Sequence, residues 1–400
     1  MYESGFLHGK VDSWCPSMHG RRRTALVDAV AGLLAGAKLT VTSLGRAVAP
    51  SLSHKHSVKR MDRLVGNRHL AKESVALYRG MAAEACAGLP VIPVLIDWTE
   101  SARTGLAMLE ASLPVSGRGL TLWRQTYCRR SLKNPRVQER FLRRLKAILP
   151  AGKRVIVMTD AGFQLSFFKA AEALGFDWVT RLGNSVLVQR EGEAGWRRPD
   201  ELSAGAKPKP QSLGHYGIGK RTTHRLTARL CLVRGARRGR KDRPNNREHG
   251  HGTMERKYRA LHTKAWVLAT SLSEADANAG QVVAWYRQRM QIEEMFRDVK
   301  SHRFGSGLDY AGSRATSRMD ALRLIGSIAL FFACLLGLAA RALQLDRQLQ
   351  VNTVRDRAVL SWHFLGRWVA SKLLRRKEIT LLEQVLQTLP QHVLPEGIPT

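Results

Sequence analysis

Two short apolar segments restrict the fold of this chain more than any other feature. Residues 91–96 (VIPVLI) and 154–159 (RVIVMT) are too short for helices and rich in β-branched side chains, as is typical of strands buried on both faces. Strands are also predicted at 106–113, 120–127, 177–181 and 265–270, and helices at 137–148 and 165–174. This order predicts an α/β fold with a mixed sheet and helices on both faces.

Each of the two buried strands runs directly into an aspartate. Asp97 follows the first strand and Asp160 follows the second. Ligands of open α/β sheets gather at the carboxyl ends of strands, so the two carboxylates could meet there. The alternative for each is an aspartate that shapes a turn or caps a helix.

A third carboxylate lies on a helix predicted to run without a break from Trp285 to Lys300, a segment free of glycine and proline. One stripe of this helix is apolar, and a separate arc of roughly 80° is polar. The polar arc consists of Tyr286, Arg289, Glu293, Arg297 and Lys300. On periodicity alone, the favoured interpretation of Glu293 is an ordinary ladder of salt bridges at i,i+4 spacing.

The chain is strongly basic, which makes converging carboxylates informative. It holds 65 Lys and Arg residues against 32 Asp and Glu residues, a formal net charge of +33, and this favours nucleic acid as partner. Asp97, Asp160 and Glu293 would repel one another unless a divalent cation lay among them, and Mg²⁺ prefers such oxygen ligands. A pair of Mg²⁺ ions serves in-line attack on phosphodiesters, and the cations beside Glu293 would hold the phosphate.

Further cations could contact DNA in two other places. Residues 1–85 are predicted to be largely helical, and in the helix at 53–65 the side chains of Lys55, Lys59 and Arg63 recur every four residues on one face. A second basic segment, 234–247, is predicted to be a loop. A solvated basic face is the alternative for the helix, and solvated disorder is the alternative for the loop.

Compartment and membrane signals are weak. The five cysteines lie far apart without zinc-ligand spacing, so we expect a reducing cytoplasm and no zinc site. Residues 1–14 lack an apolar run, so we expect no signal peptide. Residues 324–340 form an uncharged segment of 17 residues. We interpret this segment as a buried core helix, with a single membrane span as the alternative.

Four residues of the polar arc form a recognisable motif. Tyr286, Arg289, Glu293 and Lys300 have the spacing Tyr-x2-Arg-x3-Glu-x6-Lys, which resembles the signature of DDE transposases of the insertion sequence four family. The similarity extends over nearly the whole chain. It includes the segments at 60–70, 97–98, 160–163, 266–270 and 290–294.

The resemblance implies an RNase H-like catalytic core interrupted by a β-rich insertion. The implied parts are a helical domain that binds the ends of the element (1–88), the first part of the core (89–183), the insertion (184–272), the Glu-bearing part of the core (273–325) and a helical C-terminal region used in synapsis and dimerisation (326–400).

The resemblance also implies a chemistry. Asp97, Asp160 and Glu293 would be the catalytic and metal-ligating residues, with two Mg²⁺ ions that Mn²⁺ can replace. Tyr286, Arg289 and Lys300 would grip DNA phosphates near the cut, and Trp266 would stack on a flipped base, with a core tryptophan as the alternative reading. The expected protein is a cut-and-paste enzyme that acts on double-stranded DNA through a hairpin intermediate. It would form a homodimer in the synaptic complex, and it would work in the bacterial cytoplasm in association with the nucleoid. The other possibilities are a transposon-derived repressor that does not cleave and a membrane protein with a basic domain.

Overall fold

The computed structural model describes residues 2–48, 53–101, 103–219, 225–234, 265–303, 305–355, 357–372 and 377–394. The chain divides into two compact units. One unit contains Met1–Val155 and Gln288–Leu394, and the other contains Ile156–Arg287. The basic loop predicted at 234–247 lies outside the described residues except for Arg234.

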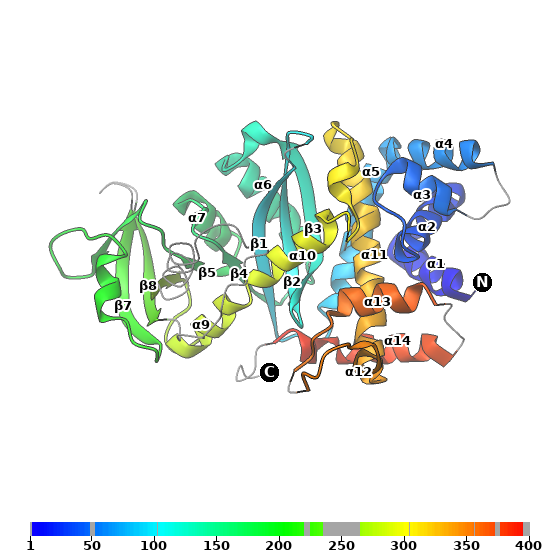
Figure 1. Cartoon of the computed structure of the whole chain (residues 1–400). Coiled ribbons are helices and arrows are strands. Elements are labelled where there is room, and N and C mark those ends of the chain that lie inside the picture. Colours follow the sequence, from blue (N-terminus) through cyan, green and yellow to red (C-terminus); the bar gives the residue numbers. More distant parts are fainter. Residues whose placement is uncertain are drawn as a thin grey trace, which may run out of the picture. The chain divides into compact units, whose positions relative to one another are not determined.

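The first unit combines helices with an antiparallel sheet of three strands (Figure 1). Its N-terminal helices are α1 (Tyr2–Trp14), α2 (Gly20–Leu34), α3 (Val41–Ala47), α4 (His54–Val65) and α5 (Arg68–Ala85). The sheet has the order β3-β2-β1, with β1 at Val91–Ser101, β2 at Leu106–Val115 and β3 at Arg118–Cys128. After β3 come η1 (Arg129–Ser131) and α6 (Pro135–Ile148).

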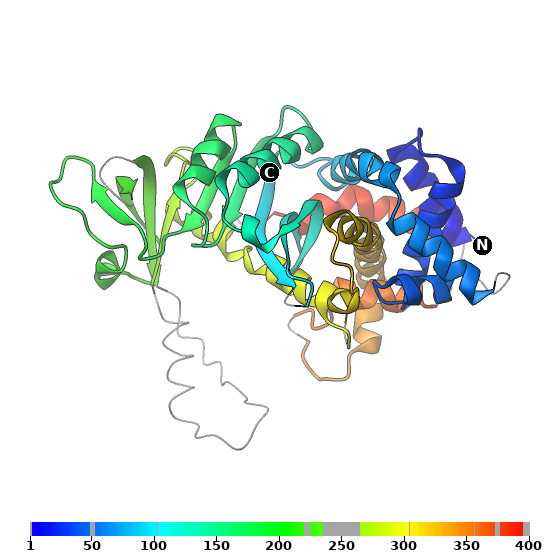
Figure 2. The same cartoon turned by 90° about the horizontal axis from the view of Figure 1, so that it is seen from above.

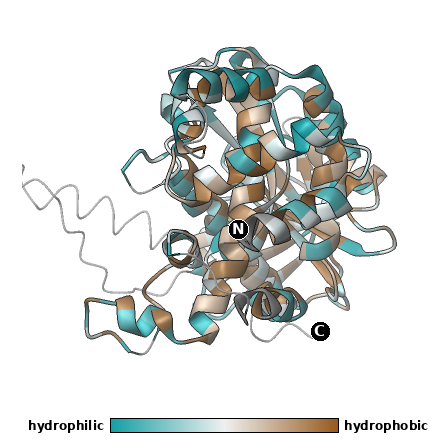
Figure 3. Cartoon of the chain, turned by 90° about the vertical axis from the view of Figure 1, so that its right-hand side faces the viewer, coloured by the Kyte–Doolittle hydropathy of each residue, from teal (hydrophilic) through white to brown (hydrophobic). Residues whose placement is uncertain are grey.

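The same unit is completed by the C-terminal helices. These are α10 (Met290–Lys300), η3 (Leu308–Tyr310), α11 (Thr316–Ala342), α12 (Leu345–Leu349), α13 (Trp362–Ala370), α14 (Lys377–Thr388) and η4 (Leu389–His392). Figure 2 shows α11 seen from above, surrounded by helices of this unit. Several of these helices alternate between hydrophilic and hydrophobic stretches in Figure 3, as helices with one buried face do.

Helix α11 forms the core of the first unit. It is long and apolar enough to cross a membrane by length and composition, but its most apolar window is completely buried within the protein. Helix α13 packs so closely on it that a Cβ at Gly337 would meet the carbonyl of Trp362, and a Cβ at Gly366 would meet that of Ala333. The structure therefore agrees with the interpretation of 324–340 as a core helix.

The second unit is built on a mixed sheet. Its strands are β4 (Arg154–Thr159, which begins just before the boundary), β5 (Asp177–Arg181), β6 (Leu187–Arg190), β7 (Gln211–Gly219), β8 (Leu226–Arg234) and β9 (Ala265–Thr270). They have the order β4-β5-β9-β8-β7-β6, with β4 and β5 parallel and the other pairs antiparallel. Its helices are α7 (Leu165–Ala173), η2 (Glu201–Gly205) and α9 (Ala279–Arg287). The predicted α/β class with a mixed sheet is confirmed.

Two details of the predicted strands are wrong, and both errors arise from pairing. Strand β1 does not end before Asp97 but continues to Ser101, because β2 pairs with it as far as the Ser101–Leu106 partners. Strands β2 and β3 extend past the predicted limits at 113 and 120, since Val115 pairs with Arg118. Only Ser116 and Gly117 lie between these partners, both with positive φ (41° and 94°), the backbone that tight hairpins require.

Candidate active site

Asp97 lies in the middle of β1, with its side chain held from two directions. Its Oδ1 accepts a hydrogen bond from the backbone N–H of Trp98 at 2.7 Å. Its Oδ2 lies 3.4 Å from Nη1 of Arg289, and the Asp97 side chain is 15% exposed. The carboxylate therefore faces a cation while retaining contact with solvent.

The same arginine contacts the second carboxylate. Nη2 of Arg289 donates to Oε1 of Glu293, whose side chain is 41% exposed. Glu293 lies in the first turn of α10, where the helix dipole favours negative charge. The Arg289 guanidinium thus lies between two carboxylates that are separated by almost 200 positions in the chain and would otherwise repel each other.

Helix α10 is held against the sheet by its apolar stripe. The buried residues of the helix are Ile292, Met295, Phe296 and Val299, as the periodicity predicts. Gly119 on β3 allows close approach, because a Cβ there would lie only 3.4 Å from the Cα of Ile292. The position of Glu293 is therefore set by apolar packing on the β2–β3 hairpin.

Two polar contacts attach the tip of that hairpin to α10, and no sequence pattern indicated them. The N–H of Gly117 donates to Oε1 of Gln291 at 3.1 Å. The Nε of Arg118 donates to Oδ2 of Asp298 at 2.7 Å. Gln291 and Asp298 are seven residues apart, so they lie on one face of the helix, on either side of Glu293 in the sequence.

The helix predicted from Trp285 to Lys300 is in fact two helices. Helix α9 ends at Arg287 and α10 begins at Met290. Between them the N–H groups of Gln291 and Ile292 bond to the carbonyls three residues back, at 2.9 and 3.3 Å, which tightens the backbone into a turn. The prediction of one unbroken helix from Trp285 to Lys300 is therefore wrong.

Tyr286 and Trp266 lie together in the second unit. The Tyr286 side chain on α9 is buried, with the residue only 6% exposed. Its ring packs edge-on against the ring of Trp266 on β9, with centroids 5.3 Å apart. Trp266 itself is half-buried, so it is neither a fully enclosed core residue nor a free surface aromatic.

Lys300 and Arg297 differ in their surroundings, although both lie near the end of α10. The Nζ of Lys300 donates to the backbone carbonyl of Glu100 at 2.7 Å. Burial lowers the pKa of Lys300, while the nearby carboxylates, Asp97 among them, act in the opposite direction. Arg297 has a side chain that is 71% exposed and pairs with Glu294 at 2.9 Å. Both cations remain accessible to a phosphate.

Asp160 follows β4 in the second unit, at the end of a strand as predicted. Its Oδ1 accepts from the N–H of Gly162 at 2.9 Å, an Asx turn that orients the carboxylate. Its backbone carbonyl accepts from Oγ1 of Thr180 on the parallel strand β5 at 3.1 Å. The side chain is half-buried. The turn-forming alternative therefore describes its local geometry correctly, although this leaves a metal role open.

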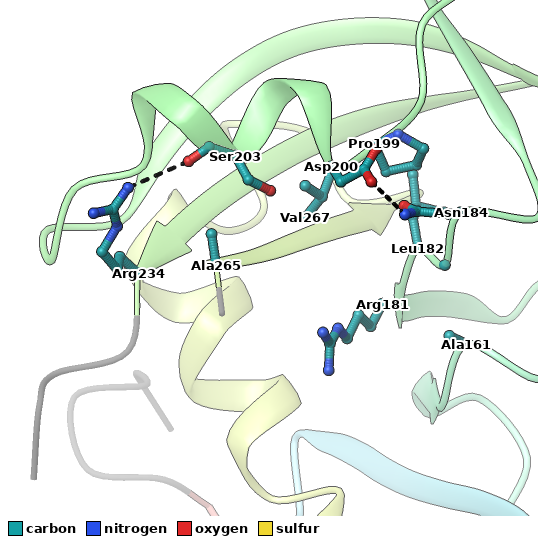
Figure 4. A pocket seen from close by; sticks show the side chains of 11 residues that line it. Ala161, Arg181, Leu182, Asn184, Pro199, Asp200, Ser203, Arg234, Ala265 and Val267 are labelled. Atoms are coloured by element: carbon teal, nitrogen blue, oxygen red, sulfur yellow. Dashed lines mark hydrogen bonds between the residues drawn. The ribbon is translucent and has the colours of Figure 1, made fainter. Parts of the chain in front are cut away.

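A basic hollow of about 540 Å³ lies beside Asp160 in the same unit. Figure 4 shows the residues around it, with the side chains of Arg181 and Arg234 at different sides. Asn184 donates to Asp200 at its wall, with a distance of 2.5 Å. Ala265 and Val267 line the hollow, and strand alternation places Trp266 on the opposite face of β9.

The predicted basic face of α4 is present at the surface. Lys55, Lys59 and Arg63 are all exposed. A second hollow, of about 500 Å³, lies where the start of α2 meets α4, and the arginines at 21, 22, 60 and 63 contribute to its lining. Salt bridges to Glu73 and Asp28 hold Arg22 and Arg60 in place. This N-terminal surface is suited to an anionic partner.

The donor set of the first unit suits a divalent cation. Asp97 and Glu293 already converge on one cationic group, Arg289, and carboxylate oxygens are the ligands that Mg²⁺ prefers. Within the residues that the structure describes, no cluster of three or more His, Cys, Asp or Glu side chains could hold a metal. Asp97 and Glu293 are therefore carboxylates of the first unit whose chemistry fits such an ion.

One comparison with known proteins identifies the chain. The family model for the transposase DDE domain matches residues 96–329, which is more than half of the chain. This range begins one residue before Asp97, contains Asp160 and Glu293, and extends into α11. No curated protein matches the chain.

Proposed function

Because this chain belongs to the family of transposases with a DDE domain, and is therefore an enzyme that cleaves nucleic acid with DNA as its substrate, we propose that it moves an insertion sequence by a cut-and-paste route. The Tyr-x2-Arg-x3-Glu-x6-Lys spacing supports membership of the insertion sequence four group. The segments around Asp97, Asp160 and Glu293 resemble the transposase of insertion sequence ten in particular.

The observation that carries this proposal is the pair of carboxylates on one guanidinium. Asp97 and Glu293 approach the same cation, Arg289, within the matched domain. Members of this family generally use divalent metal ions, and Asp97, Glu293 and Asp160 would hold them here. When bound, such ions polarise phosphodiesters and the attacking oxygen. Arg289 and Lys300 then hold the phosphate beside the carboxylates, and Tyr286 supports Trp266.

The proposed reaction has four steps, and each exchanges one P–O bond for another. Water attacks the phosphodiester at the end of the element and frees a 3′-hydroxyl on the element. That hydroxyl attacks the opposite strand, forms a hairpin and releases the flanking DNA with its own 3′-hydroxyl. Water then opens the hairpin, and the 3′-hydroxyl of the element attacks target DNA. Trp266 stacks on the base that leaves the tight hairpin.

The other parts of the chain supply binding and assembly in this proposal. The exposed cations of α4 and the basic hollow beside it hold the phosphates of the inverted repeats at the ends of the element. Residues 326–400 bring two protomers together in a homodimeric synaptic complex. The enzyme acts in the cytoplasm of a bacterial cell, on the nucleoid. Its strongly positive charge favours rapid, salt-sensitive association with DNA.

Cleavage of its own ends tests this function. Purified protein is mixed with end-labelled duplexes taken from the DNA that borders its coding region, with and without Mg²⁺ or Mn²⁺. Nicking, hairpin formation and joining should require the metal. Asp97→Asn, Asp160→Asn and Glu293→Gln should each abolish cleavage but not end binding, since each removes a ligand oxygen and little volume.

Two outcomes would contradict the proposal. Cleavage retained in one of the three variants would remove that residue from the active site. End binding by the wild-type protein without cleavage in either metal would instead support a repressor derived from a transposase.

A further inference from the structure

A continuous set of exposed cations begins where β3 ends and runs along α6. We name it the α6 surface. It consists of Arg129, Arg130, Lys133, Arg136, Arg140, Arg143 and Arg144, which are all exposed. Among the described ion pairs, Glu139 neutralises Arg143 at 2.6 Å, and Glu100 pairs with Arg129 at 2.7 Å. Most of the positive charge of this surface is thus turned to solvent.

The cations of α6 lie opposite its packed face. The buried residues of the helix are Gln138, Phe141, Leu142, Leu145 and Ile148. Arg136, Arg140 and Arg144 recur every four residues, and with Arg143 they fall within an arc of about 100° that spans about 12 Å of helix. Like charges at i,i+4 spacing destabilise a helix, so this arrangement is costly unless a polyanion neutralises it.

Glu100 connects the α6 surface to the candidate active site. It lies on β1, three residues after Asp97. Its carboxylate holds Arg129 at the start of the α6 surface. Its backbone carbonyl accepts from Lys300, the last residue of the motif on α10. The α6 surface therefore begins at the residue that also contacts the phosphate-binding lysine.

Within the first unit, the α6 surface and the basic face of α4 lie apart. Helix α6 packs on α5 and β3, whereas α4 packs on α2, α3 and α11. Figures 1 and 2 both show α6 and α4 on different sides of α11. Because the end of the element is assigned to α4 and the cut to Asp97 and Glu293, a duplex that continues past the cut has α6 as its next cationic surface.

We propose that the α6 surface binds the backbone of the flanking donor DNA, which is the duplex immediately outside the cut. This inference rests on the proposed function and adds a second DNA-binding surface to it. We assign its contacts to phosphates, which position the duplex and carry no sequence information. It holds the flank until the hairpin step releases it.

The test compares two duplexes that differ only in the flank. One stops at the cut site, and the other continues for about one helical turn beyond it, which is roughly 10 base pairs. Binding is measured by fluorescence anisotropy without divalent metal over a series of salt concentrations, so no chemistry takes place. The flanked duplex should bind more tightly, with a steeper dependence of log K on log salt, because about 0.9 is added to the slope for each phosphate neutralised.

The triple variant Arg136→Gln, Arg140→Gln, Arg144→Gln should bind the flanked duplex tenfold or more weakly than the wild type does. It should bind the unflanked duplex as the wild type does. A control triple variant, Arg198→Gln, Lys207→Gln, Lys209→Gln, removes the same charge from other exposed positions and should keep the difference. Lys59→Ala should weaken binding of both duplexes equally.

Three results would overturn the assignment. Equal losses on both duplexes would place the α6 surface on the end itself, and no loss would mean a solvated face. Normal flank binding with poor joining of pre-cut ends would assign the surface to target DNA. Because binding is read without metal, a wild type that never cleaves would count against the proposed function alone.

Discussion

At the scale of single residues, the guanidinium of Arg289 interacts with two carboxylates at once. It bridges Asp97 on β1 and Glu293 on α10, so it balances two carboxylates that would otherwise repel each other. We expect a divalent cation bound by these carboxylates to relieve the same repulsion that the guanidinium relieves. The free energy of unfolding should therefore depend on whether the Arg289 guanidinium, a divalent cation or both are present.

Arg289→Gln should destabilise the metal-free protein by about 1–3 kcal/mol, because two partly buried carboxylates lose their shared cation. Added Mg²⁺ should then raise Tm more in the variant than in the wild type. Differential scanning fluorimetry with and without Mg²⁺ measures both effects.

The matched control is Arg297→Gln on the same helix, whose exposed pair with Glu294 is worth little. If Mg²⁺ raised Tm equally in the wild type and in Arg289→Gln, the carboxylates would not depend on this arginine.

Trp266 is a residue whose role depends on its exposure. It is half-buried and packs edge-on against Tyr286, so part of its side chain is in contact with solvent. Trp266→Ala should leave the first nick near wild type but slow hairpin formation, because stacking returns roughly 1–3 kcal/mol per base. A denaturing gel of end-labelled substrate over time separates nicked and hairpin products. If both steps fell together with Tm, Trp266 would be a packing residue.

At the scale of elements, α10 is positioned by three neighbours rather than by its own sequence. Its apolar stripe packs on the β2–β3 hairpin, and Arg118 at the hairpin tip bonds to Asp298. On α13, Nδ1 of His363 lies 3.5 Å from the same Asp298 carboxylate. Burial lowers the pKa of His363 to about 4, so this contact is dipolar at neutral pH and is not a salt bridge.

Asp298→Ala and Arg118→Ala should each slow cleavage and increase the Mg²⁺ concentration needed for half-maximal rate, because α10 carries Glu293. A double-mutant cycle in urea unfolding should give a coupling free energy of about 1–3 kcal/mol, as expected for a charge-assisted bond with restricted exposure.

The exposed Arg143–Glu139 pair supplies a control cycle, where coupling should stay below about 1 kcal/mol. Slower cleavage with an unchanged Mg²⁺ requirement would show that Asp298 does not act through Glu293.

At the scale of the whole molecule, a buried ionic cluster beneath the sheet accompanies the apolar core of α11. Glu110, which is fully buried, accepts from Arg323 of α11 and lies 3.4 Å from Arg124. Asp320, also on α11, accepts from the N–H of Thr126 at 2.8 Å. Burial raises the pKa of Asp320 to about 6.

Asp320 should make stability depend on pH. Its folded pKa lies above the unfolded value, so its contribution is fully present below about pH 4 and is lost as pH rises through 6. Asp320→Asn removes this titrating group. The effect of the substitution on the free energy of unfolding, relative to wild type, should therefore be more favourable at pH 7.5 than at pH 4.5 by on the order of 2–3 kcal/mol. Urea unfolding at both pH values measures this difference between variant and wild type.

The comparison with wild type is needed because His363 acts in the opposite direction. Its folded pKa is depressed to about 4, so stability is lost as pH falls from 6.5 towards 4. Asp62→Asn, on the surface in a pair with Arg318, is the control and should leave the profile unchanged. A profile for Asp320→Asn identical to wild type would contradict the raised pKa.

Features that depend on local pattern could be predicted from the amino-acid sequence. Strands β4, β5 and β9 begin and end where predicted, since the apolar side chains of a buried strand occur consecutively. The buried stripe of α10 was also predictable, because helical periodicity places its members on one face. The motif around Glu293 needs only spacing, and it agrees with the family that the chain matches.

Features that depend on pairing between distant segments could not be predicted in this way and became visible in the folded protein. Strand β1 runs through Asp97 because β2 offers partners beyond it, and Arg289 reaches Asp97 across 192 positions of sequence. The hold of Arg118 on Asp298 and the link from Glu100 to the α6 surface have no local signature. Such contacts arise when packing brings elements together, so no period or motif along the chain records them.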